Sequence, residues 1–180
     1  VGGLRLPNDD TGDCYMFTAA LAERCAASGV EFRFSTPIDE IESDGRRVMG
    51  VRTPAGLVVA GAYVVALGSY STPLLQRVGI EIPVQPVKGY SLTAAILDPA
   101  KAPVSTVLDE TYKVAITRLG HRVRIGGLAE LSGFDLSLPD SRRATLERSA
   151  GSLFGDSCDL ANASFWCGLR PMTPDGPPLI

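Results

Sequence analysis

The stretch Ala62–Leu75, AYVVALGSYSTPLL, says most about the fold. Residues 62–67 form an apolar run without alternation, which is typical of a strand covered on both faces, as in a parallel sheet. Gly68 and small hydroxyl residues then interrupt the run, and a short helix is expected after them. This order of strand, loop and helix predicts an α/β fold, in which ligands bind beyond the carboxyl ends of the strands.

The segment before this stretch changes from helical to strand periodicity. Residues 11–29 are expected to form a helix that Thr11 or Asp13 can cap and that Gly29 can end. Apolar side chains recur along one face of this helix, at Phe17, Leu21 and Cys25. In residues 30–34 the apolar side chains alternate instead, which predicts a strand.

Antiparallel strands are expected on both sides of the opening stretch. Residues 43–61 contain two turn signals, and they predict a meander of short strands. Three further strands are expected, over residues 105–110, 113–118 and 122–130, with a tight turn at Gly120 between the last two. Residues 140–154 then predict a helix, although Arg142 and Arg143 would lie in its first turn, where the helix dipole disfavours cations.

Composition narrows the classes of function. The 180 residues suffice for one ordinary domain or parts of two, and 45% hydrophobic with 21% charged residues is typical of globular proteins. A net charge of -3 offers no basic surface for nucleic acid. No apolar run approaches the length of a membrane span, and no signal-peptide pattern follows Val1.

The cysteines and the single histidine exclude several kinds of site. No two of the four cysteines have CxxC spacing, so neither a zinc site nor a disulfide framework is expected. We interpret them as reduced thiols of the core in a cytosolic compartment. His121 falls in the expected hairpin turn and is interpreted as a solvated residue, so no Ser-His-Asp set and no catalytic side chain is assigned. A GxGxxG dinucleotide motif is also absent from the sequence.

Five stretches nevertheless carry a family resemblance: GGLRLPNDDTGDCYMFTAALA, AYVVALGSYSTPLL, PVQPVKGYSLT, VSTVLDETYKVAITR and FWCGLRPMTPDGPPLI. Together and in this order they resemble the small subunits of bacterial D-amino-acid dehydrogenases. Those proteins belong to the D-amino-acid oxidase and glycine oxidase superfamily of FAD-dependent oxidoreductases. The resemblance covers essentially the whole chain, and it implies that the chain is similar to an interior portion of such an enzyme.

The resemblance implies a mixed α/β and α+β architecture. Residues 1–83 and 162–180 would belong to a discontinuous, Rossmann-like FAD-binding domain, and residues 84–161 to a substrate domain with an antiparallel sheet. The implied reaction is oxidative deamination of D-amino acids, in the setting of bacterial D-alanine catabolism, with FAD as the cofactor. FAD binding by the 180 residues alone is expected to be weak or absent, because the glycine motif that normally receives the pyrophosphate is missing.

The substrate contacts implied by the resemblance are Arg170 and Tyr112. Arg170, in GLRP, matches the family arginine that pairs with the substrate carboxylate, and a planar guanidinium suits that role. Pro171 and the turn that follows would restrict its backbone. Tyr112 lies near the position of a substrate-facing family tyrosine, but a packing role is an equal alternative. Arg118 and Lys88 are other cations that we interpret as structural.

The cofactor contacts come from the same resemblance. Residues expected to lie against FAD are Ile38, Ala66, Gly68, Ser69, Gly89 and Met172. Gly68 could equally be a plain turn glycine and Gly89 a strand bulge. The implied partners are a D-amino acid and the quinones of an electron-transport chain, at a cytoplasmic location or on the inner face of the cytoplasmic membrane. An oxidase that uses oxygen and a non-catalytic carboxylate-binding module stay open as alternatives.

Overall fold

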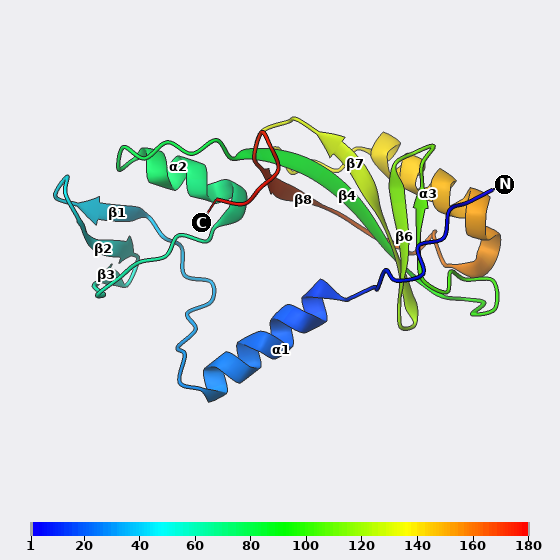
Figure 1. The fold of residues 1–180 in the computed structure, drawn as a ribbon, viewed down its shortest axis with the longest axis horizontal. Coiled ribbons are helices and arrows are strands. Elements are labelled where there is room, and N and C mark those ends of the chain that lie inside the picture. Colours follow the sequence, from blue (N-terminus) through cyan, green and yellow to red (C-terminus); the bar gives the residue numbers. More distant parts are fainter. Residues whose placement is uncertain (1, 180) are drawn as a thin grey trace. The chain divides into compact units, whose positions relative to one another are not determined.

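The computed structural model describes residues 2–179, which divide into two compact units. Within the described residues, the first unit comprises residues 2–30, 89–129 and 137–167, and the second comprises residues 31–88, 130–136 and 168–179. The elements in chain order are α1 (Cys14–Ala27), β1 (Glu40–Ser43), β2 (Val48–Thr53), β3 (Gly56–Val58), η1 (Gly68–Tyr70), α2 (Ser71–Gln76), β4 (Gln85–Ala95), β5 (Thr106–Asp109), β6 (Val114–Leu119), β7 (Arg122–Glu130), α3 (Asp140–Phe154), η2 (Gly155–Ser157) and β8 (Ser164–Met172) (Figure 1).

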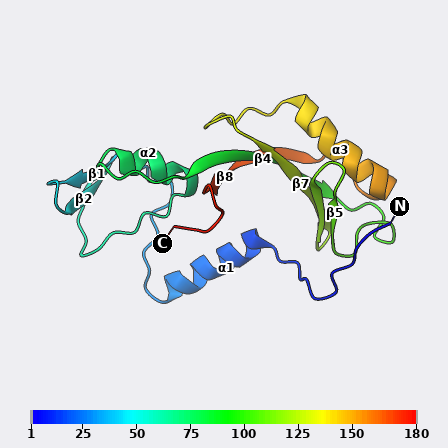
Figure 2. The same cartoon turned by 45° about the horizontal axis from the view of Figure 1, so that its top comes forward.

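The core of the first unit lies between a five-stranded sheet and one helix. The strand order is β5-β6-β7-β4-β8, with β5/β6 and β6/β7 antiparallel. Figure 2 shows α3 along one face of this sheet. The hydrophobic side chains that are at most 2% exposed come from three of the strands and from the helix: Tyr90, Leu92, Ala94, Val114, Ile116, Val123, Ile125 and Leu146. Their alternation along each strand gives the sheet one apolar face.

Arg143 in helix α3 has a structural role that the sequence did not reveal. Its guanidinium donates to Glu147 Oε1 at 2.7 Å and to the carbonyl oxygens of Leu160 at 3.0 Å and of Ala161 and Ala163 at 3.4 Å. These bonds hold the segment that leads into β8. The contact therefore offsets the unfavourable place of this cation in the first helical turn.

The second unit contains a small meander and a short helix. Strands β1, β2 and β3 form an antiparallel sheet in sequence order, and an ion pair between Arg52 and Glu42 links β2 to β1. Helix α2 contacts β1, and Arg77 after it donates to the carbonyl oxygen of Asp39 at 2.7 Å. The meander and the short helix that the sequence predicts are thus confirmed.

Two predicted strands are wrong. Residues 30–34 and 62–67 form no strand, and no described residue pairs with either of them. Phe32 and Phe34 instead stack on each other with ring centroids 5.4 Å apart, and Val64 is 91% exposed. An apolar run becomes a strand only when a neighbouring backbone completes its hydrogen-bond ladder, and the pattern alone does not supply that neighbour.

Other expectations can be compared directly with the structure. None of the four cysteines forms a disulfide, but only Cys158 is buried and Cys14 is exposed, so their assignment to the core is wrong for Cys14. His121 is exposed in the turn between β6 and β7, as predicted. Among the described residues, no helix is long and apolar enough to cross a membrane. No described group of three or more His, Cys, Asp or Glu residues could hold a metal ion.

Candidate cofactor and carboxylate site

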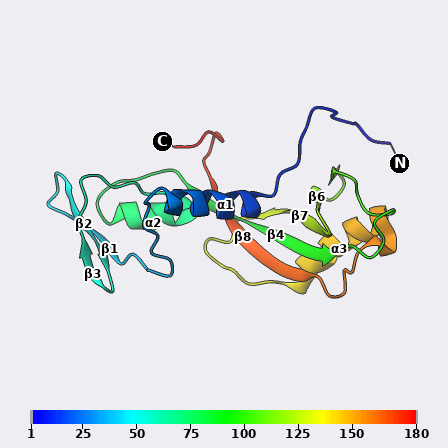
Figure 3. The ribbon, with the colours of Figure 1, turned by 90° about the horizontal axis from the view of Figure 1, so that it is seen from below.

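Arg170 lies near the end of strand β8, with its side chain exposed. Pro171 follows it and disfavours helical backbone angles at Arg170, which is consistent with its extended conformation in the strand. Beyond the strand, Thr173 Oγ1 donates to the carbonyl oxygen of Pro177 at 2.8 Å and closes the turn that contains Gly176. Figure 3 shows β8 beside β4. The guanidinium is therefore carried by a paired strand rather than by a loose terminal loop.

The turn η1 contacts the residues on both sides of Arg170, the backbone of Leu169 and the ring of Pro171. Ser69 is 3% exposed, and its Oγ donates to the carbonyl oxygen of Leu169 at 3.4 Å. Gly68 has a φ of +56°, and a Cβ built on it would lie 3.6 Å from Cγ of Pro171. The left-handed backbone favours glycine at this position, and the missing side chain leaves the turn open to a close ligand.

The other cofactor candidates of the second unit lie in two places. Ala66 is an exposed small residue just before η1, and Met172, 43% exposed, ends β8. Ile38 lines a shallow cavity of about 390 Å³ with six other residues: Glu31, Arg33, Thr36, Val51, Thr53 and Val58. Apolar walls with a polar rim are the usual environment of an aromatic ring with polar edges. The residues at Ile38 therefore fit an adenine ring.

A charged pair lies on the rim of this cavity. Arg33 Nε donates to Glu31 Oε1 at 2.7 Å, and both side chains are mostly exposed. This hydrogen bond, together with the nearby positive charge, lowers the pKa of the Glu31 carboxyl and raises that of the Arg33 guanidinium. Both groups are therefore charged at neutral pH, and they offer an acceptor and a donor to a ligand beside Ile38.

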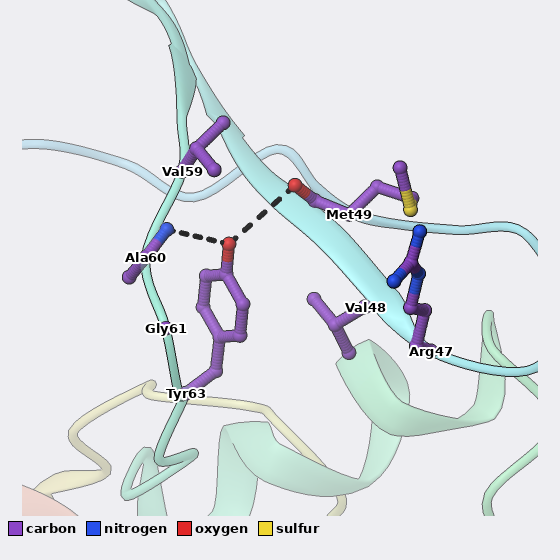
Figure 4. Close-up of a pocket in the computed structure, with 7 residues that line it drawn as sticks. All are labelled: Arg47, Val48, Met49, Val59, Ala60, Gly61 and Tyr63. Carbon is purple, nitrogen blue, oxygen red and sulfur yellow. Dashed lines mark hydrogen bonds between the residues drawn. The ribbon is translucent and has the colours of Figure 1, made fainter.

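A second cavity of about 410 Å³ is lined by Arg47, Val48, Met49, Val59, Ala60, Gly61 and Tyr63 (Figure 4). The Tyr63 hydroxyl accepts from the amide of Ala60 at 2.8 Å and donates to the carbonyl oxygen of Met49 at 3.5 Å. None of the residues predicted to bind substrate or cofactor lies here. The tyrosine fixes the segment after β3 against β2, and we assign the cavity no ligand.

Two predicted site residues belong to the first unit. Gly89 is buried within β4. Tyr112 lies in the turn between β5 and β6, not on a strand, and it packs half-buried against the hydrophobic core. These contacts agree with the packing alternative for Tyr112, and its role toward substrate stays a prediction. Arg118 has a structural contact, because its Nε donates to the carbonyl oxygen of Gly120 at 3.2 Å.

The sequence analysis missed the strands that organise this site. Neither the length of β4 nor the existence of β8 was predicted. The signal was present in both, since Tyr90, Leu92 and Ala94 alternate in β4 and Phe165, Cys167 and Leu169 alternate in β8. The contact between η1 and β8 had no such signal, because residues about 100 positions apart meet there.

Comparison with known proteins identifies the class of protein to which this fold and site belong. The family model described as FAD dependent oxidoreductase matches residues 1–180. The chain belongs to this family.

Within the family, the chain is similar to proteins named D-amino acid dehydrogenase. It is 71% identical over 180 residues to the one from Phenylobacterium zucineum and 56% identical over 180 residues to the one from Vibrio cholerae. The whole chain takes part in both matches, but it spans only 42% and 43% of the length of these relatives.

Solved structures agree with the family assignment. Glycine oxidase from Geobacillus kaustophilus is 30% identical and superposes with a TM-score of 0.72, over 89% of this chain and 42% of that protein. The L-proline dehydrogenase from P. horikoshii superposes with a TM-score of 0.73 over 89% of this chain and 44% of that protein. Its identity of 20% makes it a likeness of fold alone. The predicted mixed α/β class with antiparallel sheets is confirmed.

Proposed function

We propose that this chain is the part of an FAD-dependent D-amino-acid dehydrogenase that binds the substrate carboxylate and one side of the cofactor. The observation that carries the proposal is 56–71% identity along the whole chain to proteins named D-amino acid dehydrogenase. In the complete enzyme a D-amino acid is converted to a 2-oxo acid and ammonia. Residues 1–83 and 162–180 serve the FAD-binding domain, and residues 84–161 the substrate domain.

Arg170 is the proposed ligand of the carboxylate. A guanidinium stays charged at every physiological pH and offers parallel N–H donors to both oxygens of a carboxylate. Its position on a strand braced by Pro171 limits the directions in which the side chain leaves the backbone. A rigid donor loses less freedom when it binds, which favours a tight and oriented complex. Tyr112 is a second proposed substrate contact.

FAD is the proposed cofactor. Ile38 would lie at the adenine ring, and the remaining contacts would come from Ala66, Gly68, Ser69, Gly89 and Met172. The chemistry supplied by bound FAD is the two-electron oxidation of the amino acid at its α-carbon, and water then hydrolyses the imino acid. This chain's own residues bind and orient the substrate, so no histidine or other proton-transfer group is required of them.

Quinones of a membrane electron-transport chain are the proposed acceptor, reached from the cytoplasm or from the inner face of the cytoplasmic membrane. The similar proteins are named dehydrogenases rather than oxidases, which supports an acceptor other than oxygen. An oxidase that reduces oxygen is the second candidate, because glycine oxidase from Geobacillus kaustophilus is a close structural neighbour.

A chimera tests the proposal. These 180 residues replace the matching segment of the Phenylobacterium zucineum relative, and the purified chimera is desalted and assayed with D-alanine and L-alanine. We expect retained flavin absorbance and oxidation of D-alanine only, with reduction of a soluble quinone analogue. Hydrogen peroxide as the product would favour the oxidase. A chimera that holds FAD yet oxidises no D-amino acid would refute the proposed function.

The 180-residue chain by itself is the matched control for cofactor binding. We expect it to lose flavin absorbance on desalting, because its sequence contains no GxGxxG motif to receive the pyrophosphate. Flavin that stays bound to the isolated chain would show that the candidate residues suffice without that motif.

A further inference from the structure

Lys88 on strand β4 is a buried cation that the proposed function leaves unexplained. Its side chain is 0% exposed, and its Nζ donates to Asp135 Oδ2 at 3.1 Å. The Asp135 side chain is 50% exposed. Removing an ammonium from water is costly, and an apolar residue of similar size often serves the stability of a core as well or better. The pair therefore calls for a role beyond packing.

Asp135 belongs to a tight turn that contacts both Lys88 and η1. The amide of Asp135 donates to the carbonyl oxygen of Ser132 at 3.2 Å, and Gly133 within the turn has a φ of +60°. Residues 132–135 form this turn. Phe134, next to Asp135, packs its ring on Tyr70 with centroids 5.1 Å apart and an interplanar angle of 35°. The turn thus contacts Lys88 through the side chain of Asp135 and η1 through the side chain of Phe134.

Tyr70 is the last residue of η1, whose other two residues contact Leu169 and Pro171 on either side of Arg170. Ser69 donates to the carbonyl oxygen of Leu169, and Gly68 lies against the ring of Pro171. Each contact joins neighbouring residues, so the path from Lys88 to Arg170 is continuous and short. All of these residues belong to the second unit.

We propose that Lys88 is a positioning residue: through Asp135 it fixes the turn of residues 132–135, which holds η1 against β8 and so sets the orientation of Arg170. The inference rests on the proposed role of Arg170 as the carboxylate ligand. Without the ion pair, η1 loses its outer support and Arg170 samples several orientations. The apparent affinity for a carboxylate then falls by the fraction of molecules in the competent orientation.

The test uses the full-length chimera with Lys88→Met. We expect KM for D-alanine to rise about tenfold, as for a competent fraction of roughly a tenth, while kcat changes less than about threefold. The dissociation constant of propionate, a carboxylate that cannot react, should rise by the same factor in calorimetry. FAD content is measured in the same preparations and both constants are referred to the FAD-loaded enzyme, because η1 also carries Gly68 and Ser69, two of the proposed cofactor residues.

Two lysine variants separate positioning from a general structural effect. Lys88→Arg keeps a buried cation that can reach Asp135, and KM should return to within about threefold of the parent value. Lys101→Met removes an exposed lysine that pairs with Asp98 at 3.3 Å, and it should change neither constant. Equal KM values for Lys88→Met and the parent would overturn the inference.

Asp135→Asn gives an independent test should Lys88→Met fail to fold. It removes the negative charge that the buried ammonium of Lys88 pairs with, from the half-exposed side of the pair, and we expect a similar rise in KM. The double variant should be no worse than either single one, because both remove one interaction. Effects that multiply to about a hundredfold would overturn the inference, as would a parent-like KM in Asp135→Asn.

Arg170→Leu in the same chimera distinguishes a failure of the proposed role of Arg170 from a failure of the positioning role of Lys88. If this variant keeps normal kcat/KM, the proposed function of Arg170 fails, and the inference on Lys88 fails with it. If Arg170→Leu is impaired while Lys88→Met and Asp135→Asn bind D-alanine and propionate normally, only the positioning role of Lys88 is refuted.

Discussion

The helices α1 and α3 of the first unit have nearly the same length but opposite surroundings. Helix α3, with 15 residues, buries Leu146, Ser149 and Ala150 against the sheet. Helix α1, with 14 residues, is the more apolar of the two and buries none, and Tyr15 and Phe17 are 75% and 69% exposed. Apolar content therefore does not determine which helix contributes to the core. A helix contributes to the core when another element offers an apolar surface against which it can pack.

Different interactions consequently hold the two helices. Helix α1 is held mainly by local bonds, since Asp13 Oδ1 accepts from the amides of Tyr15 at 3.0 Å and Met16 at 3.2 Å. The other oxygen of this carboxylate lies 3.8 Å from Arg122 in β7, a single and longer tertiary contact. Helix α3 begins after Pro139, which provides no side-chain cap, and it relies on tertiary contacts. The 2.6 Å hydrogen bond from Ser149 Oγ to Asp109 Oδ2 is one of these.

The largest expected effect separates the two helices directly. Leu146→Ala in the 180-residue chain removes a side chain that is 0% exposed, and we expect a loss of about 2–5 kcal/mol in the free energy of unfolding. Leu21→Ala on α1, where the side chain is 48% exposed, should cost less than about 1 kcal/mol. Urea titrations measure both. Equal losses would show that α1 also packs into a core.

The second prediction concerns Arg170, an exposed side chain that should affect activity strongly and stability little. Arg170→Leu should lower kcat/KM for D-alanine by roughly 100- to 1,000-fold, because the carboxylate loses a charged bidentate partner. Arg170→Lys should recover only part of this loss, since an ammonium cannot make the paired contact. Steady-state kinetics measure the ratio. Both variants should keep FAD and the parent's unfolding free energy, which distinguishes a binding defect from misfolding.

The third prediction concerns the local bonds of α1. Asp13→Ala should destabilise the helix by about 0.5–2 kcal/mol, because two amides of its first turn lose their acceptor. Hydrogen exchange of the first-turn amides of α1 should accelerate, while exchange in α3 stays unchanged. Asp13→Asn keeps the acceptor and removes the charge, so it should preserve most of the protection. Acceleration in both helices would contradict a local role for the cap.

The smallest effect depends on pH. The hydrogen bond from Ser149, assisted by the backbone amides of Thr111 and Tyr112, lowers the pKa of the Asp109 carboxyl below its ordinary value of 3.8. A carboxyl with a lowered pKa in the folded state stabilises the fold above its unfolded pKa. That stability is lost as the pH falls through the folded value.

Ser149→Ala tests this linkage. It should cost about 1 kcal/mol at pH 7, and the difference from the parent should shrink as the pH is lowered below 3.8. Unfolding titrations at a series of pH values measure the difference. Ser152→Ala, which removes a hydrogen bond within the same helix, should give a difference that does not vary with pH.

The sequence predicted the elements that follow local rules. Helix α3 and strand β7 have the bounds that the sequence indicated, because periodicity and flanking turn residues define both. Residues 30–34 and 62–67 were mispredicted because the partner of a strand is set by distant parts of the chain. The same limit applies to the site. A motif singled out Arg170, whereas the turn around Phe134, the contact of η1 with β8 and the burial of Lys88 are tertiary facts without a local signature.

The pairing of β8 with β4 has a kinetic consequence. Ser164 Oγ, at the start of β8, donates to the carbonyl oxygen of Thr93 in β4, 71 positions earlier. Such distant pairing closes a long loop. The entropy lost in closing this loop is offset only by contacts that form after the intervening strands and helix have folded. During refolding, the strand that carries Arg170 would dock last. The carboxylate affinity proposed for Arg170 should therefore emerge in a slower phase than the bulk of the sheet.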